Sequence, residues 1–368
     1  MINIQMVDLS SQLKNIRKEV DQAIANVLDT TAFIKGKDVQ EFTNELSQWN
    51  NSQHTIGVAN GTDGLQIAMM ALGLKPGDEV IVPVFTYVAT AEVIALLQLK
   101  PVFIDVEPDT FNIDVSQLDQ ILTNRTKAIV PVHLFGQVSN MDSINEFAEK
   151  NNLYVIEDVA QAIGSEYKGK KAGNIGHIGV TSFFPSKNLG CFGDGGAIFT
   201  NNDELAENIK MIANHGQKVK YYHDVIGVNS RLDTVQAAIL RVKLKELDSY
   251  IGRRQNAAKF YDQSLSVVDW IETPARFEDS THVFHQYTIK VKNGKRDNLK
   301  EYLQDKGIPS MIYYPVPLHL QKAYSGLAEK GDFPVSEQLC DEVLSLPMHT
   351  ELDKNQLEYI CSTLKSFE

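Results

Sequence analysis

The pattern of hydrophobic and polar residues changes twice along the chain. Before residue 50, apolar residues recur every three to four positions, which is the period of an amphipathic helix. From Asn60 onward, short apolar runs alternate with helical stretches, and near residue 250 the pattern of apolar and polar residues shifts again. Because the runs are apolar on both faces, they predict buried strands of a mainly parallel sheet that is covered by helices.

The predicted elements follow from these periods. Helices are expected at 8–50 with a break at 33–36, and at 65–72, 89–97, 141–150, 203–214, 232–259 (one long helix or two), 297–306, 340–345 and 354–364. Strands are expected at 79–83, 101–105, 127–132, 153–157, 180–184, 197–200 and 285–291. The shift near residue 250 divides the chain into two predicted domains, 1–250 and 251–368.

Charge and composition narrow the class of protein. The chain has 368 residues, and its 35 Lys and Arg against 47 Asp and Glu give a net charge of −12. An acidic chain without a basic patch argues against binding to nucleic acid or to anionic membranes. Three cysteines without CxxC spacing argue against a disulfide framework and a zinc site, and neither a leader nor a membrane-spanning run is expected. The prediction is a soluble, cytoplasmic protein without a bound metal.

One lysine lies between two predicted strands. Lys187 follows the apolar run 180–184, in a loop of small, polar and glycine residues that ends at the run 197–200. Desolvation among apolar neighbours disfavours the ammonium form of a lysine, and a neutral amine can form a Schiff base with an aldehyde. The alternative is a surface lysine on a glycine-rich turn.

A glycine-containing turn precedes the helix expected at 65–72. In the segment Asn60–Leu65, Gly61 allows a ligand to approach the backbone. The free N–H groups of the first helical turn favour an anion such as phosphate. The alternative is an ordinary helix cap after a turn.

Further candidates stand at or beyond strand ends. Asp158 lies at the edge of the sheet where ligands of open α/β proteins bind, and it could hold a proton on a pyridine nitrogen or cap the next turn. Tyr87 lies at the same edge, and it could stack on a flat cofactor or pack in the core. Arg231 suits a carboxylate or a phosphate, although a surface ion pair is the usual fate of an arginine.

Other enzyme classes lack their motifs in this chain. The glycines at Gly190, Gly193 and Gly195 do not stand between a strand and a helix, as they would in a dinucleotide-binding site. Neither an HExxH pair nor a GxSxG turn is present. These absences argue against a dehydrogenase, a metallohydrolase and a serine hydrolase.

Seven segments together resemble the DegT/DnrJ/StrS family of sugar aminotransferases, which depend on pyridoxal phosphate (PLP). They run over most of the chain in the order of the family. The segments are NGTDGL (Asn60–Leu65), PVFTYVATA (Pro83–Ala91), EDVAQ (Glu157–Gln161), SFFPSKNLGCFGDGGA (Ser182–Ala197), NHG (Asn214–Gly216), GVNSRLDTVQAAIL (Gly227–Leu240) and YYPVPLHLQ (Tyr313–Gln321).

The resemblance implies an α/β fold, the fold-type I architecture of PLP-dependent aminotransferases. A large domain with a mainly parallel, mixed seven-stranded sheet would be followed by a smaller α+β domain, and the protein would work as a homodimer. Lys187 would bind PLP covalently and move the proton between carbon centres, and Asp158 would pair with the pyridinium nitrogen.

The remaining roles are also implied by the resemblance. Gln161 would hydrogen-bond the ring oxygen, and Tyr87 would stack on the pyridine. The phosphate would be held by Gly61, Thr62, Asp63, Ser182 and Asn229 of the partner subunit. Substrate contacts would come from Arg231, Tyr314, His319, Tyr222 and Lys35.

The reaction implied by the resemblance is a ping-pong transfer of an amino group. The donor would be glutamate, and the acceptor would be a keto group of a UDP- or dTDP-linked sugar, for amino sugars of a surface polysaccharide or glycan such as O-antigen. Residues 227–240 resemble members that aminate the 3-keto position, although 4-keto members share most motifs. The alternatives are a PLP-binding regulator without turnover and a related PLP enzyme that acts on amino acids.

Overall fold

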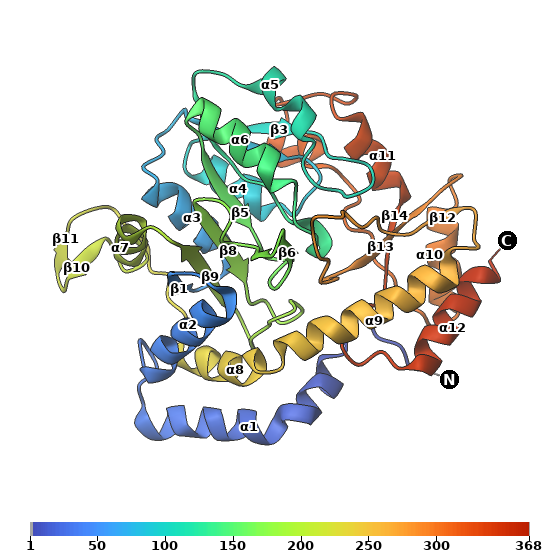
Figure 1. The fold of residues 1–368 in the computed structure, drawn as a ribbon, viewed down its shortest axis with the longest axis horizontal. Helices are drawn as coiled ribbons and strands as arrows, with labels where there is room; N and C mark the ends of the chain where they lie inside the picture. Colours follow the sequence, from blue (N-terminus) through green and yellow to red (C-terminus); the bar gives the residue numbers. More distant parts are fainter. Residues whose placement is uncertain (1–2, 368) are drawn as a thin grey trace.

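The computed structural model describes residues 3–367, which form a large α/β unit and a smaller unit beside it (Figure 1). The strands of the main sheet lie in the order β1 (His54–Val58), β9 (Gly196–Thr200), β8 (Ile178–Ser182), β5 (Tyr154–Asp158), β4 (Thr126–Ile129), β2 (Glu79–Pro83) and β3 (Lys100–Ile104). From β8 to β3 all neighbours are parallel, whereas β9 is antiparallel to both β8 and β1. The expected mainly parallel, mixed seven-stranded sheet is confirmed.

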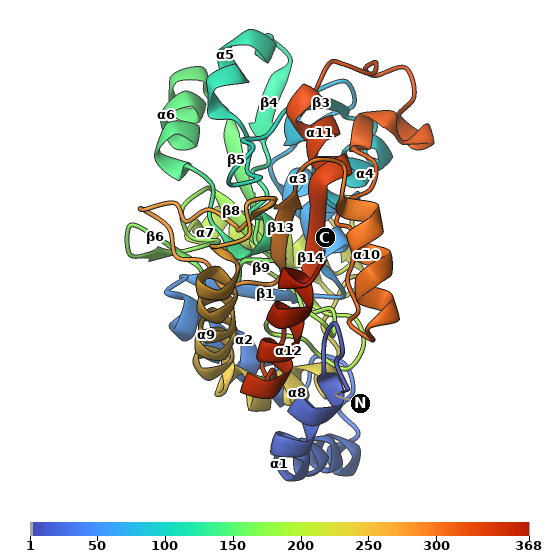
Figure 2. The same ribbon diagram turned by 90° about the vertical axis from the view of Figure 1, so that its right-hand side faces the viewer.

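Helices cover both faces of this sheet (Figures 1 and 2). One face packs against α3 (Gly61–Ala71), α4 (Ala89–Leu96) and α7 (Asp203–Ile212). The other packs against α2 (Lys37–Asn50), α6 (Met141–Asn151) and α8 (Thr234–Leu244). Successive residues of a strand point to opposite faces, so Val80 and Val82 join the first core and Ile81 joins the second. This two-sided burial explains why the strands are continuous apolar runs.

Helix α1 (Leu9–Thr30) lies outside these layers. It packs on α8 through Ile16, Val20 and Ile239. The expected break between α1 and α2 is present, and Ile34 within it forms an antiparallel bridge with Asp233. Among residues 3–367, the structure contains no helix that is both long and apolar enough to cross a membrane.

Strand β1 was not expected from the sequence. Only Ile56 and Val58 of its five residues are buried, because β1 forms one edge of the sheet. A half-buried strand with a glycine at its centre gives a weak periodic signal. Short elements complete the large unit: α5 (Leu118–Ile121), β6 (Glu166–Tyr167), β7 (Lys170–Lys171), β10 (Gln217–Val219) and β11 (Tyr222–His223).

The smaller unit is built on an antiparallel sheet. Its elements are β12 (Ile271–Glu272), β13 (Tyr287–Val291), β14 (Val343–Leu346), α10 (Arg296–Asp305), α11 (Pro334–Glu342) and α12 (Lys354–Lys365). The helix expected at 340–345 is wrong, because α11 ends at Glu342 and the chain continues as β14. All four residues of β14 are buried and pair with β13, so tertiary pairing decides their conformation.

Helix α9 (Leu247–Leu265) joins the two units, and α8 and α9 are two helices in succession. Leu247 and Ile251 pack in the core beneath the main sheet, whereas Ala258 and Leu265 pack in the core of the smaller unit. Helices α9 and α12 lie side by side (Figure 2). The boundary proposed at residue 250 falls inside α9, and the division into 1–250 and 251–368 stays a prediction.

Candidate active site

The loop between β8 and β9 carries Lys187 and folds back on itself. The N–H of Phe183 donates to the Gly195 carbonyl at 2.7 Å, and the N–H of Cys191 donates to the Phe183 carbonyl at 2.8 Å. A Cβ on Gly190 would lie 2.3 Å from the carbonyl oxygen of Pro185, so only glycine fits at that crossing. Residues Phe183–Gly195 therefore form a tight loop, and they do not continue strand β8.

The amine of Lys187 is half-buried and lies near Asp158. Burial lowers the pKa of Lys187 to about 8, against the opposing attraction of the Asp158 carboxylate. Among residues 3–367, Nζ has no hydrogen-bond partner. A lysine with a pKa near 8 is roughly one-quarter neutral at pH 7.5, so its amine is available as a nucleophile.

Asp158 is the last residue of β5 and is buried. Its Oδ2 accepts a hydrogen bond from Thr90 Oγ1 at 2.8 Å, and its Oδ1 accepts one from the Ala160 N–H at 3.1 Å. Thr90 comes from the first turn of α4 and was not singled out from the sequence. The sequence offered one indication of its role, because Thr90 follows Tyr87 by three residues in the segment after β2.

A buried pair beside Asp158 fixes the end of β5. Glu157 accepts hydrogen bonds from backbone N–H groups within 173–176 and from His133 Nε2 at 3.0 Å. His133 Nδ1 accepts from the Ser139 N–H, so Nε2 carries the proton and donates to Glu157. The His133 N–H donates to the Asp158 carbonyl at 3.1 Å, which holds the strand end on that side.

Gln161, Tyr314 and Tyr87 lie together beyond the same edge. Gln161 Nε2 donates to the Tyr314 hydroxyl at 3.2 Å, while its Oε1 accepts from the Phe135 N–H at 2.9 Å. The ring centroids of Tyr87 and Tyr314 are 6.3 Å apart. Burial raises the pKa of Tyr314, whereas Tyr87 is 57% exposed. Tyr87 therefore offers its ring to the open side of the site.

The turn before α3 lies against the start of the Lys187 loop. Asn60 caps α3 by accepting the Asp63 N–H at 2.8 Å, as the alternative interpretation of this turn required. This cap leaves the N–H groups of Gly61 and Thr62 available at the helix terminus. A Cβ on Gly61 would lie 2.8 Å from Ser182 Cβ, so the two segments are in direct contact. Backbone N–H groups and hydroxyls gathered in this way suit a phosphate.

Four candidate residues lie apart from this group. Lys35 and Arg231 line a groove of about 550 Å³, in which Arg231 Nη1 lies 3.5 Å from Asn214 Oδ1. Asn229 is exposed, and Tyr222 is 70% exposed in the β10–β11 hairpin. Within residues 3–367, no hydrogen bond or ion pair links these four to Lys187 or Asp158.

His319 is placed differently from the other candidates. It is buried, its Nε2 lies 3.1 Å from Glu337 Oε1, and its ring packs edge-on against Phe333. Its Nδ1 has no hydrogen-bond partner among residues 3–367. Nε2 of the imidazole is thus paired with α11, whereas Nδ1 is buried without a recorded partner in this part of the chain.

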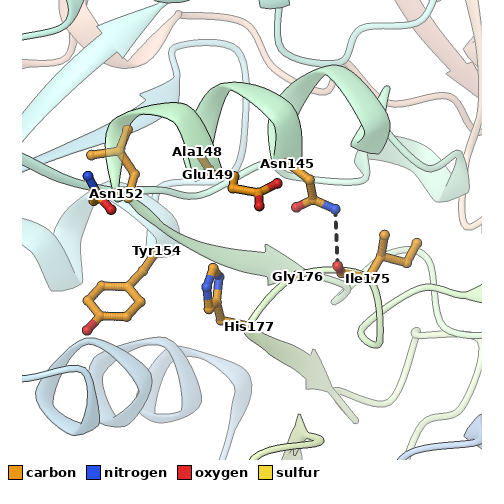
Figure 3. A pocket seen from close by; sticks show the side chains of 9 residues that line it. Asn145, Ala148, Glu149, Asn152, Tyr154, Ile175, Gly176 and His177 are labelled. Atoms are coloured by element: carbon orange, nitrogen blue, oxygen red, sulfur yellow. Dashed lines mark hydrogen bonds between the residues drawn. The ribbon is translucent and has the colours of Figure 1, made fainter.

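A larger cavity, of about 600 Å³, lies at the opposite edge of the sheet (Figure 3). Glu149, Tyr154 and His177 line it. Tyr154 is the first residue of β5 and Asp158 is the last, so the two edges are separated by the length of the strand. The lysine lies near Asp158, and the terminus of α3 lies against the start of the lysine loop. The candidate active site is therefore at this edge of the sheet and not in the larger cavity.

Comparison with known proteins adds independent information. The profile of the DegT/DnrJ/EryC1/StrS aminotransferase family matches residues 14–365. A pleiotropic regulatory protein of Geobacillus stearothermophilus is 46% identical over 100% of this chain and 99% of its own length. UDP-2-acetamido-2-deoxy-3-oxo-D-glucuronate aminotransferase of Pseudomonas aeruginosa is 47% identical over 98% of this chain and 99% of its own length.

Two solved structures share the fold. DesV of S. venezuelae in complex with a ketimine intermediate has a TM-score of 0.97 and 38% identity, with 99% of this chain and 98% of that chain covered. NtdA of Bacillus subtilis with the bound cofactor PMP has a TM-score of 0.89 and 32% identity, with 98% and 82% covered.

Proposed function

Since the chain belongs to the DegT/DnrJ/EryC1/StrS aminotransferase family, we propose that it transfers an amino group from glutamate to the 3-keto group of a nucleotide-linked sugar. The observation that carries the proposal is the half-buried amine of Lys187 beside the buried carboxylate of Asp158. The 3-keto position is supported by the P. aeruginosa relative, which acts on a UDP-linked 3-oxo sugar.

PLP is the cofactor of this aminotransferase, and the site fits it. Lys187 offers an amine with a lowered pKa for covalent attachment, and Asp158 offers a carboxylate for the ring N–H. When bound, PLP supplies an aromatic ring that delocalises the charge of a carbanion. Lys187 then holds and returns the proton, and Asp158 keeps the ring nitrogen protonated.

The neighbouring residues position the cofactor in this proposal. Gln161 is held by Phe135 and Tyr314, and it hydrogen-bonds the ring oxygen. The exposed ring of Tyr87 stacks on the pyridine. The phosphate ligands are Gly61, Thr62, Asp63, Ser182 and Asn229 of the partner subunit.

Substrate recognition rests on groups from both parts of the chain. Arg231 and Lys35 are two of the three cations that line one groove of an acidic protein, the third being Lys210, so they suit a diphosphate or a sugar carboxylate. Tyr314, which is hydrogen-bonded to Gln161, and His319 are the further substrate contacts of this proposal, and both come from the segment between α10 and α11. Tyr222 lies on an exposed hairpin. Because Arg231 and Tyr222 lie apart from Lys187 in one chain, we propose a homodimer in which each subunit completes the site of the other.

The experiment is a product assay with defined acceptors. The enzyme, PLP and glutamate are incubated with UDP- and dTDP-linked 3-keto and 4-keto sugars, and products are identified by mass spectrometry. We expect amination of a 3-keto sugar, and no product with Lys187→Ala, which keeps cofactor non-covalently. Full activity of Lys187→Ala would overturn the role of Lys187, and amination of the 4-keto sugars alone would overturn the 3-keto assignment in favour of its alternative.

A second candidate is a PLP-binding regulator without turnover. The observation that favours it is the name of the Geobacillus relative, a pleiotropic regulatory protein. Mixing the holoenzyme with glutamate alone separates the two, because an aminotransferase converts the bound cofactor to its amine form and changes its absorbance. The aminotransferase proposal also includes a location in the cytoplasm and a role in surface glycan synthesis, such as that of O-antigen.

A further inference from the structure

A second buried lysine lies beneath the loop of Lys187. Lys243, in the last turn of α8, is only 2% exposed. Its Nζ donates to the carbonyl oxygen of Gly190 at 2.5 Å. Among residues 3–367, it forms no ion pair with a carboxylate. Its neighbours include the ring of Phe192 and the thiol of Cys191, and the guanidinium of Arg254 repels its charge.

A lysine is energetically unfavourable at this buried position. Burial lowers the pKa of Lys243 to about 8, because the ammonium is removed from water without an opposite charge beside it. Replacing a buried charged group by an apolar side chain of similar volume is often neutral or stabilising. Packing alone therefore does not account for Lys243, and its hydrogen bond to Gly190 is the feature to explain.

Gly190 belongs to the segment that fixes Lys187. Gly190 lies three positions after Lys187, and it packs directly on the backbone of Pro185 at the crossing of the loop. On the other flank, Asn188 Nδ2 donates to the Val283 carbonyl at 3.0 Å. The loop is thus tied to the rest of the protein on both sides, at Asn188 and at Gly190.

A cavity borders the loop on the outer flank of the Gly190 side. A cavity of about 330 Å³ lies between α1 and the loop, with Leu13, Ile16, Pro185 and Phe192 among its lining residues and Lys243 in its wall. A loop that borders a cavity has room to shift toward it, because few atoms oppose the movement. The hydrogen bond from Lys243 is therefore one of the restraints on this side, beside the two hydrogen bonds between Phe192 and Gln236 and the burial of Leu189 and Cys191.

We propose that Lys243 is a positioning residue, which holds the Gly190 carbonyl and so keeps the amine of Lys187 half-buried and directed toward Asp158. The role of Lys243 in turnover rests on the proposed function, whereas its effect on the Lys187 amine does not. Loss of the hydrogen bond lets the loop relax toward the cavity. The Lys187 amine then becomes better hydrated, and its pKa moves back toward that of a free lysine.

The test compares Lys243→Met with Lys245→Met, which removes an equal charge from an exposed position two residues away. The pKa of Lys187 is measured in the apoprotein from the pH dependence of acetylation by acetic anhydride, followed by peptide mass spectrometry. The midpoint is expected near 8 in the wild type and in Lys245→Met, and about one unit higher in Lys243→Met, within the range that loss of burial allows. Thermal unfolding is expected to change by about 4 °C or less, since the buried charge contributes little stability.

Turnover provides the second measurement. In Lys243→Met, kcat is expected to fall about tenfold or more, with KM for glutamate within about threefold of the wild type, because positioning of Lys187 rather than binding is lost. A folded Lys243→Met with a wild-type midpoint and kcat overturns the proposal. If the methionine variant does not fold, Lys243→Leu, which also lacks a donor, replaces it under the same criteria. A raised midpoint without aminotransferase activity in the wild type would support the positioning role and overturn the proposed function instead.

Discussion

At the scale of single residues, the donors around Asp158 determine what its carboxylate can do. Thr90 and the Ala160 N–H each occupy one oxygen, which leaves lone pairs on both oxygens for a further donor. The Glu157–His133 pair fixes the backbone of the same strand end. A carboxylate held in this way can meet a ring N–H without reorienting, and such pre-organisation is the main source of electrostatic catalysis.

Asp158→Asn is expected to lower kcat by about 100-fold or more, because the amide cannot keep a ring nitrogen protonated. Cofactor occupancy, measured by absorbance after gel filtration, should fall by less than about threefold. The control Thr90→Val keeps the charge and removes one donor, so it should cost about tenfold or less in kcat. An equal loss of turnover and occupancy in Asp158→Asn would show that the carboxylate is only a clamp for the cofactor.

At the scale of elements, α9 is the connection between the two hydrophobic cores. Its first turns pack beneath the main sheet and its last turns pack in the smaller unit, with Tyr261 fully buried and bonded to the Pro347 carbonyl at 2.9 Å. Because α9 packs in both cores, unfolding of one core is expected to destabilise the other. Tyr314, which accepts a hydrogen bond from Gln161 and comes from the segment between α10 and α11, depends on this coupling.

Leu303→Ala, in the core of the smaller unit, is expected to reduce the free energy of unfolding by about 2–5 kcal/mol. Because α9 belongs to both cores, calorimetry should show one transition that shifts as a whole. Leu240→Ala, in the core beneath the main sheet, is the matched variant and should shift the same transition. Two resolved transitions, of which each variant moves only one, would show that the cores unfold separately.

At the scale of the whole molecule, one surface carries unusually exposed apolar side chains. Val219, Tyr221 and Tyr222 of the β10–β11 hairpin are 61%, 76% and 70% exposed, and Ile226 is 86% exposed. They lie near Asn229, a residue that the proposed site needs from a partner. An exposed apolar patch beside a residue that is missing from the site of its own chain fits an interface between two copies.

Ile226→Asp is expected to convert a dimer into monomers at micromolar concentration, because a carboxylate in an apolar interface must be desolvated. Light scattering coupled to gel filtration measures the mass, and kcat should fall with the dimer fraction. Val267→Asp, the same change at a 73% exposed position beyond α9, is the control and should leave both unchanged. A fully active monomer would refute the shared site.

The amino-acid sequence by itself determined the order of the main-sheet strands and of the helices that cover them between residues 60 and 215, and the positions of Lys187, Asp158 and Tyr87 at loop and strand ends. The short elements α5, β6 and β7 were not expected. The expected features depend on local runs of apolar residues and on the residues next to them, so periodicity and spacing reveal them. The resemblance of seven segments extended this to the family and the cofactor, and both were confirmed.

Only the tertiary structure decided the rest. β1 and β14 are strands because distant strands pair with them, and residue 343 onward was wrongly expected to be helical. Thr90 meets Asp158 across 68 positions, and Lys243 meets Gly190 across 53. A hydrogen bond between residues so far apart leaves no local pattern in the sequence, because it depends on how the layers pack and not on the neighbours of either residue.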